Sequence, residues 1–146
     1  MTTTTAQHTT TSTVGTLSRH LPTAGRIVMG LLFFVTGLNG FLNFLPQSAE
    51  SMPAGALAFS TALAQTGYML PLAMGVQLLV GTLLLVNRFV PLALALLAPV
   101  VVNIFAFHVF LAPEGLPVAI AVSALEVCLA WAHRDAFRSM LRAARA

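Results

Sequence analysis

The fold of this chain is decided by the stretch from Gly67 to Leu111, which reads GYMLPLAMGVQLLVGTLLLVNRFVPLALALLAPVVVNIFAFHVFL. Two apolar runs, roughly residues 69–86 and 89–111, are separated here by a polar turn that contains Arg88. A helix of about 20 apolar residues spans a hydrocarbon core of about 30 Å. The stretch therefore predicts two membrane-spanning helices joined by a turn.

Two further apolar runs flank this stretch, roughly at residues 26–45 and 117–133. The run 26–45 is not a secretory signal, because its apolar pattern is longer than the roughly 7–15 residues of a signal core. Of the 146 residues, 58% are hydrophobic and only 8% are charged, which is too little charge for a soluble domain of this size. We therefore predict an all-α integral membrane four-helix bundle.

The distribution of charge predicts the orientation of this bundle. All seven Lys and Arg residues are arginines. They are Arg19 and Arg26 before the first span, Arg88 between the second and third spans, and Arg134, Arg138, Arg142 and Arg145 after the fourth. The other two connections carry Glu50 and Glu114 but no basic residue. By the positive-inside rule the arginine-bearing side is cytoplasmic, which gives a multi-pass protein with an N-in/C-in topology. This topology accounts for the net charge of +3, so no nucleic-acid partner is indicated.

The chain divides into three parts. Residues 1–24 are rich in threonine and cannot bury apolar area, so we expect a disordered cytoplasmic tail. Residues 25–138 form the four-helix transmembrane domain in the bilayer, and residues 139–146 form a basic cytoplasmic tail. After Trp131 the fourth helix is expected to continue, so that its arginines share one face and bind anionic lipid head groups. A plain stop-transfer signal explains the same arginines equally well.

The first outer connection, residues 46–67, is long enough to contain a short helix. Leu57 and Thr61 recur at helical spacing, and Pro53 and Gly67 stand near the two ends of the pattern. The weak polarity of this segment predicts an interfacial helix on the outer membrane surface or a lid over the bundle.

A single carboxylate, Glu126, lies in the middle of the fourth apolar run. Burying a charge at that depth costs a few kcal/mol or more, so the residue is a functional-site candidate. At about 1.5 Å per residue, Gln77 lies at the same level, near the bilayer midplane. Asn39 and Asn103 fall in the outer half, and Asn43 and His108 fall near the outer interface. We therefore predict an outward-opening polar pocket with its floor at Gln77 and Glu126. The candidate binding residues are Asn39, Asn43, Gln77, Asn103, His108 and Glu126.

Each of these residues also has an ordinary structural interpretation. Asn and Gln often join transmembrane helices through hydrogen bonds worth about 0.6–2 kcal/mol, and we favour this role for Asn39, Asn43 and Asn103. An interfacial His108 is more often a snorkelling side chain than a ligand. For Glu126 the cost of burial favours a function, such as carrying a proton that His108 exchanges with the outer side.

The sequence carries no metal-binding cluster, phosphate-binding loop or nucleophile motif. Cys128 is the only cysteine, which excludes an intramolecular disulfide and a CxxC relay, and we interpret it as a small apolar filler. An autonomous enzyme is therefore not expected, and no catalytic residue, metal or cofactor is evident.

Three stretches of this chain carry a family resemblance. They are RIVMGLLFFVTGLNGFLNFLP at residues 26–46, the stretch 67–111 quoted above, and ALEVCLAWAHRDAF at residues 124–137. Together they resemble the DoxX family of small four-helix bacterial membrane proteins. The resemblance implies a bacterial inner-membrane location. Members often carry a lysine where Gly40 stands and a glutamate where Gln77 stands, so this chain keeps Glu126 as its only core carboxylate.

Three functional hypotheses follow from these features. The family takes its name from the small subunit of a thiosulfate:quinone oxidoreductase, so the first hypothesis is an accessory role beside a quinone-linked redox partner that supplies the quinone. The second is a small oligomeric transporter or ligand-binding module that uses the polar pocket at Gln77 and Glu126. The third is a structural membrane adaptor whose polar residues only fix the register of the helices.

Overall fold

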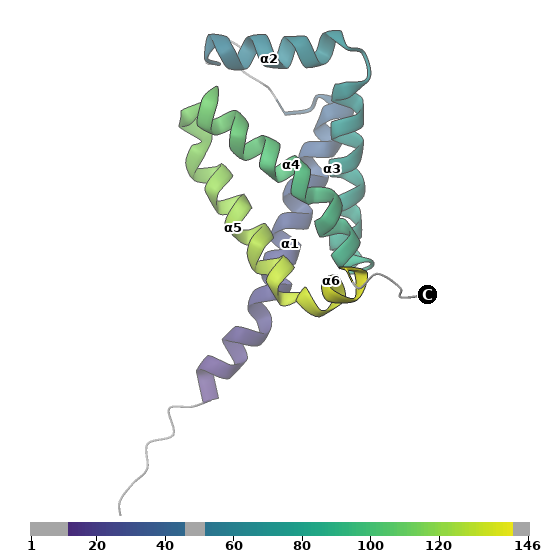
Figure 1. Cartoon of the computed structure of the whole chain (residues 1–146), viewed down its shortest axis with the longest axis vertical. Coiled ribbons are helices and arrows are strands. Elements are labelled where there is room, and N and C mark those ends of the chain that lie inside the picture. The colour runs from purple at the N-terminus through teal and green to yellow at the C-terminus, as the bar shows by residue number, and fades with distance from the viewer. Residues whose placement is uncertain (1–11, 46–51, 142–146) are drawn as a thin grey trace, which may run out of the picture.

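The structure is a computed structural model that describes residues 12–45 and 52–141. The described residues form helices joined by short turns, with no strand among them (Figure 1). In chain order the elements are α1 (Ser12–Leu42), α2 (Ala54–Gln65), α3 (Met69–Leu85), α4 (Val90–Phe110), the 3-10 turn η2 (Pro113–Gly115), α5 (Leu116–Ala132) and α6 (Arg134–Leu141). The predicted all-α fold is confirmed.

The four predicted spans correspond to α1, α3, α4 and α5. The segment Leu21–Leu42 of α1, the whole of α4 and the segment Pro113–Ala132 around α5 are each long and apolar enough to cross a membrane. Helix α3 has 17 residues, or about 26 Å, which is near the lower limit for a span. The predicted integral membrane four-helix bundle is therefore confirmed.

Helix α1 begins earlier than its apolar run. The sequence predicts a disordered tail over residues 1–24, whereas α1 starts at Ser12 and includes residues 12–24. Once a helix has formed, each added residue gains one backbone hydrogen bond, so an apolar span can extend into a polar neighbour. Pro22 lies inside α1 without ending it. Residues 1–11 of the expected tail lie outside the described residues.

Helices α1 and α4 each pack against both α3 and α5, and consecutive spans run in opposite directions (Figure 1). The closest approach is between α1 and α3, where glycines remove side chains from the contact. A Cβ atom on Gly37 would lie 2.5 Å from the backbone nitrogen of Leu78, and one on Gly81 would collide with the backbone of Phe34. The α1–α3 contact therefore requires glycine at both positions.

The two ends of the bundle differ. We call the end with the α3–α4 turn and α6 the arginine end, and the opposite end, crossed by α2, the α2 end (Figure 1). The largest fully buried side chains are Met29, Leu84, Leu94, Leu97, Leu129 and Val80. These residues come from the parts of all four spans that lie toward the arginine end. The hydrophobic core is therefore concentrated at that end.

At the arginine end, Arg26 of α1 binds the end of α3. Its Nη1 donates to the carbonyl oxygen of Leu84 and, at 3.5 Å, to that of Leu85. The last carbonyls of a helix have no partner within the helix, and the partial negative charge at that terminus favours a cation. Arg26 therefore donates hydrogen bonds from a neighbouring helix to the carbonyl groups at the end of α3.

The predicted short helix in the first outer connection is confirmed as α2, which lies across the α2 end at 94° to α3 (Figure 1). Gly67 allows this bend because its φ of +77° lies in the left-handed region that favours glycine. Phe59 of α2 packs on Phe107 of α4, with ring centroids 5.7 Å apart. This contact supports the interpretation of α2 as a lid over the bundle.

The sequence predicts that the fourth helix continues past Trp131, and this prediction is wrong. Helix α5 ends at Ala132, and His133 has non-helical backbone angles of φ −105° and ψ 16°. The imidazole Nδ1 of His133 lies 2.9 Å from the carbonyl oxygen of Leu129, which helps to satisfy the end of α5. The chain then turns into the separate helix α6.

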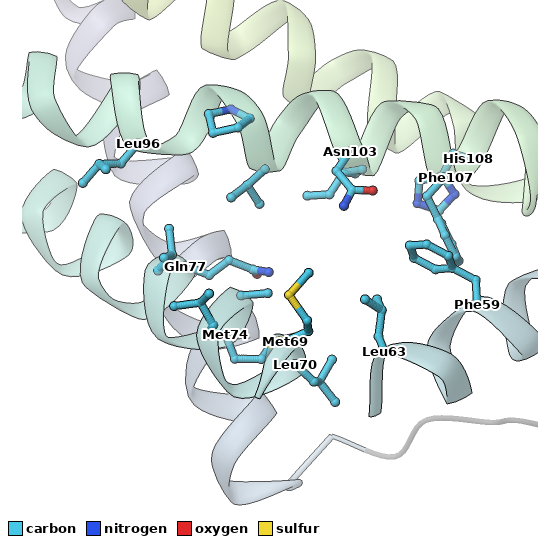
Figure 2. Close-up of a pocket in the computed structure, with 16 residues that line it drawn as sticks. Phe59, Leu63, Met69, Leu70, Met74, Gln77, Leu96, Asn103, Phe107 and His108 are labelled. Carbon is cyan, nitrogen blue, oxygen red and sulfur yellow. The ribbon is translucent and has the colours of Figure 1, made fainter. Parts of the chain in front are cut away.

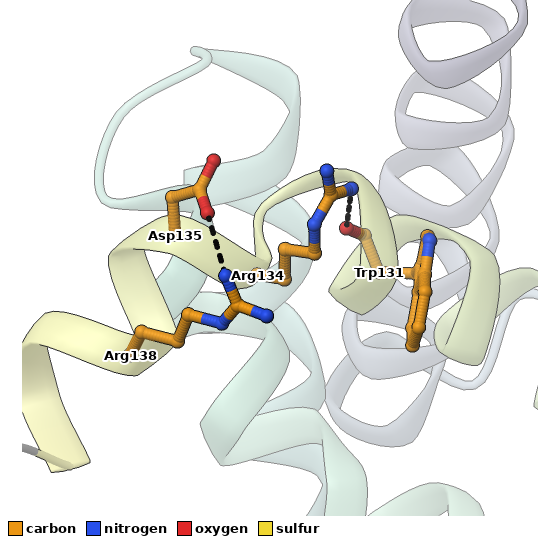
Figure 3. A network of polar contacts seen from close by, with 4 residues as sticks. All are labelled: Trp131, Arg134, Asp135 and Arg138. Carbon is orange, nitrogen blue, oxygen red and sulfur yellow. Dashed lines mark hydrogen bonds and ion pairs between the residues drawn. The ribbon is translucent and has the colours of Figure 1, made fainter.

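The polar contacts of α6 are local (Figure 3). Arg134 donates to the backbone oxygen of Trp131 at 3.4 Å, and Arg138 lies 3.7 Å from Asp135. Phe137 packs against the hydrophobic core, which holds α6 across the arginine end. Arg142 and Arg145 lie outside the described residues, so the expected shared arginine face is seen only for Arg134 and Arg138.

Candidate functional site

A cavity of 590 Å³ lies beneath α2, between α3 and α4, and we call it the α2–α3–α4 cavity (Figure 2). Its walls are mainly apolar and include Phe59, Leu63, Met69, Met74, Leu96 and Ile104. Three lining residues carry polar heads, namely Gln77, Asn103 and His108. A largely apolar cavity of several hundred Å³ with a few polar groups is the usual form of a small-molecule site.

Gln77 is held against α1 and reaches into the cavity (Figure 2). The hydroxyl of Thr36 donates to Gln77 Oε1 at 3.0 Å. The same hydroxyl lies 2.8 Å from the carbonyl oxygen of Leu32 and has only one proton, so a rotated Gln77 amide would satisfy both contacts. Either orientation leaves one half of the amide facing the cavity.

Asn103 projects from α4 toward the same cavity (Figure 2). Its side chain is exposed and forms no hydrogen bond with another described residue. An amide offers two donors and an acceptor, and in an apolar setting unused groups are costly. Asn103 is therefore the cavity residue with the most free hydrogen-bonding capacity.

His108 lines the cavity near its α2 end (Figure 2). Its Nδ1 lies 3.0 Å from the carbonyl oxygen of Ala112, and its ring meets that of Phe107 edge to face at 5.3 Å. Since a carbonyl only accepts, Nδ1 carries a proton in this contact, and in the corresponding tautomer Nε2 is the acceptor. The ring also lies directly over Gly115, where a Cβ atom would collide with it. These contacts fix the position of His108.

Asn39 and Asn43 do not line this cavity. Asn39 is buried, and its Oδ1 accepts a hydrogen bond of 2.7 Å from the backbone N–H of Leu45. Its backbone oxygen accepts from the N–H of Asn43, which has a left-handed φ of 48°. The two asparagines thus terminate α1, which is a local role and differs from the hydrogen bonding between helices favoured for them from the sequence.

Glu126 lines a different hollow, which we call the α4–α5 groove, with a volume of 340 Å³. The groove is formed by Ala98, Val101, Val102 and Phe105 of α4 and by Ser123, Glu126 and Val127 of α5. The predicted single pocket with its floor at Gln77 and Glu126 is therefore divided into two sites. Depth along the bundle axis determines the level of a residue but not the side of the helix on which it lies.

The cavity also contains residues that sequence analysis did not propose for the site. Phe59 and Leu63 come from α2, and Met69 and Met74 come from the first half of α3. The signal that could have identified Phe59 and Leu63 is the weak polarity of the connection 46–67, which indicates that α2 covers apolar surface.

The described residues contain no group of three His, Cys, Asp or Glu side chains that could hold a metal ion. Cys128 is a free cysteine on the surface of the bundle rather than a buried filler. An exposed apolar thiol is compatible with a position against lipid.

Comparisons with known proteins identify one family. The model of the DoxX family matches residues 21–109, which include most of α1, all of α2 and α3, and nearly all of α4. No curated protein and no solved structure matches the chain. The matched segment contains the α2–α3–α4 cavity, whereas Glu126 lies outside it.

Proposed function

Because the chain belongs to the DoxX family, we propose that it is an accessory membrane protein that holds a lipid-soluble quinone in the α2–α3–α4 cavity for a redox partner. The observation that carries this proposal is the cavity itself, with its volume of 590 Å³ and its mainly apolar walls. A quinone combines an apolar ring and tail with two carbonyl oxygens that only accept hydrogen bonds. Apolar walls with few polar groups suit such a molecule.

The polar groups of the cavity suit both redox forms of a quinone. The free amide of Asn103 can donate to a quinone carbonyl. In the tautomer of His108 whose Nδ1 donates to Ala112, Nε2 is an acceptor, and it suits the hydroxyl of the reduced quinol. The cavity therefore offers a donor for one form and an acceptor for the other.

Access to the cavity is available at the surface of the bundle. Leu72 and Leu96, two of the lining residues, are 59% and 37% exposed. A lipid-soluble ligand can therefore enter laterally, between α3 and α4. In contrast, the buried core formed by residues such as Met29, Leu84 and Leu97 lies between the cavity and the arginine end. This arrangement favours binding over passage across the membrane.

The proposal is tested by titrating decylubiquinone into the full chain in lipid nanodiscs, with empty nanodiscs subtracted. Replacing Asn103 by leucine removes the free amide and keeps a similar volume. Loss of one hydrogen bond is worth about 1 kcal/mol, so Asn103→Leu should weaken binding about fivefold. Thr82→Val is the matched control, since the Thr82 hydroxyl bonds only to Leu78 of its own helix and lies outside the cavity.

Two results would contradict this function. One is failure of the unmodified chain to bind the quinone above the level of empty nanodiscs. The other is equal affinity for the unmodified chain, Asn103→Leu and Thr82→Val, which would show that the amide of Asn103 does not bind the quinone. The redox partner is tested separately by a detergent pull-down from native membranes, where recovery of this chain alone would contradict the accessory role.

A further inference from the structure

The carboxyl of Glu126 is an exception among the buried polar groups of this protein. The residue is only 7% exposed, and its Oε2 atom is buried without a hydrogen-bond partner among the described residues. A buried carboxyl without a partner loses its hydration and gains nothing in return. A donor supplied from outside the described chain would complete this group.

The neighbouring polar groups do not complete it. The hydroxyl of Ser123, which lines the same groove, donates to the backbone oxygen of Ala119 at 2.8 Å. Arg26 is engaged with the carbonyl groups at the end of α3. In the described part of the chain the one ion pair joins Arg138 to Asp135 at the arginine end. Glu126 therefore has neither a donor nor a counter-ion within the described protein.

The shape of the α4–α5 groove limits what can supply the missing donor. Along α4 it extends from Ala98 to Phe105, or about 10 Å at 1.5 Å per residue. Its rim residues Val102 and Val127 are 68% and 65% exposed, so the groove is open to the hydrocarbon phase. Two helical turns are short for a crossing helix but sufficient for a compact molecule. Except for Ser123 and Glu126, the lining is apolar.

We propose that the α4–α5 groove is a second binding site, which takes a compact lipid-soluble molecule with one ammonium group. The carboxyl of Glu126, whose Oε2 is buried in the free protein, turns toward the groove and accepts from the ammonium, and the apolar body lies against Val101, Phe105 and Val127. The choice of an ammonium follows from charge, because a cation both donates the missing hydrogen bond and balances a carboxylate. The site is separate from the α2–α3–α4 cavity and does not depend on quinone binding.

Binding is tested by calorimetric titration of 4-phenylbutylamine into the full chain in nanodiscs, against empty nanodiscs. We expect saturable binding that falls at least tenfold in Glu126→Gln, which keeps the side-chain shape but removes the charge. The matched control is Glu114→Gln, because Glu114 is an exposed glutamate in η2 outside the groove. The methyl ether of 4-phenylbutanol, which has no donor, should bind at least tenfold more weakly than the amine.

Equal amine affinity in the unmodified chain and Glu126→Gln would overturn the proposal, as would equal affinity for the amine and the ether. A second measurement uses the unmodified chain and does not depend on a folded variant. The apolar reagent dicyclohexylcarbodiimide should modify Glu126, as located by peptide mass spectrometry, and the amine should protect it. A Glu126 carboxyl that reacts equally with and without the amine would also overturn the proposal.

Discussion

Arg26 illustrates how single polar residues are accommodated in this apolar chain. Its guanidinium reaches from α1 to the terminal carbonyl groups of α3, at Leu84 and Leu85. Arg26 thereby satisfies carbonyl groups that a helix end leaves without partners. Asn39 lies near the other end of α1, where its side chain accepts the N–H of Leu45 in the chain just beyond the helix. Glu126 differs from both because its Oε2 has no such partner in the described residues.

The contact of Arg26 predicts a measurable loss of stability. Arg26→Met keeps the aliphatic stem and removes the charged donor, and we expect the free energy of unfolding to fall by about 1–2 kcal/mol. Arg88→Met is the matched control, because Arg88 is exposed and lies over Phe89 at 5.8 Å without binding a helix end. Reversible unfolding in mixed micelles measures the free energy of unfolding of both variants. Equal effects would contradict a specific role for Arg26.

The glycine contact between α1 and α3 predicts opposite effects for one substitution at two positions. Gly37→Ala places a methyl group 2.5 Å from Leu78 N and 2.9 Å from Met74 O, so the helices must separate. We expect a loss of about 1–3 kcal/mol. At Gly75 the nearest atom to an added Cβ is Phe41 Cζ at 4.0 Å, so Gly75→Ala should gain up to about 1 kcal/mol from helix propensity. The same unfolding assay distinguishes the two variants. A loss of stability in Gly75→Ala without one in Gly37→Ala would contradict the packing described.

At the level of elements, α2 determines whether the α2 end of the bundle is open or covered. It lies at 94° to α3 and contacts α4 through the rings of Phe59 and Phe107. The residues of α2 that face the bundle also line the α2–α3–α4 cavity, so movement of α2 changes access to that cavity. A single aromatic contact is worth about 0.5–1.5 kcal/mol, which is small enough for α2 to open.

Removal of this aromatic contact should widen access to the cavity from the α2 end. In a Cys128→Ala background, a cysteine introduced as Gln77→Cys reports access through its rate of reaction with N-ethylmaleimide. Adding Phe59→Ala should raise this rate several-fold, because a contact worth about 1 kcal/mol shifts an opening equilibrium by about fivefold. Leu57→Ala serves as the control on α2, since Leu57 is exposed and outside the cavity. An unchanged rate in Phe59→Ala would show that α2 is not a lid.

For the whole molecule, the main feature is the difference between the two ends of the bundle. The buried core lies toward the arginine end, and the α2–α3–α4 cavity lies at the α2 end. Arg26, Arg88, Arg134 and Arg138 lie at the arginine end, while Glu114 lies at the α2 end. By the positive-inside rule this asymmetry predicts that the arginine end faces the cytoplasm and that the cavity faces outward.

This orientation is tested by labelling with a membrane-impermeant maleimide in intact bacterial cells. In a Cys128→Ala background, Glu114→Cys should react in intact cells, and Arg138→Cys should react only after the membrane is permeabilised. Both positions are exposed in the structure, so a difference reports the side of the membrane rather than burial. The reverse pattern would contradict the N-in/C-in topology.

The predicted spans and the observed helices agree closely because their limits are local properties of the chain. The run 69–86 corresponds to α3 at Met69–Leu85, and the run 89–111 to α4 at Val90–Phe110. Length and apolar composition determine such a span, since a bilayer requires every backbone group to be paired within the helix. The break at His133 was not predicted, because it depends on Phe137 packing against the core.

The sequence by itself determined the membrane environment, the four spans and the short helix α2, and it predicts the level of each polar residue along the bundle. Only the tertiary structure decided that Gln77, Asn103 and His108 share one cavity, while Glu126 faces the separate α4–α5 groove. The physical reason is that helical rise gives depth from residue number, whereas the direction of a side chain depends on how each helix is rotated against its neighbours. That rotation is determined by long-range contacts, such as the approach of α1 and α3 at Gly37 and Gly81.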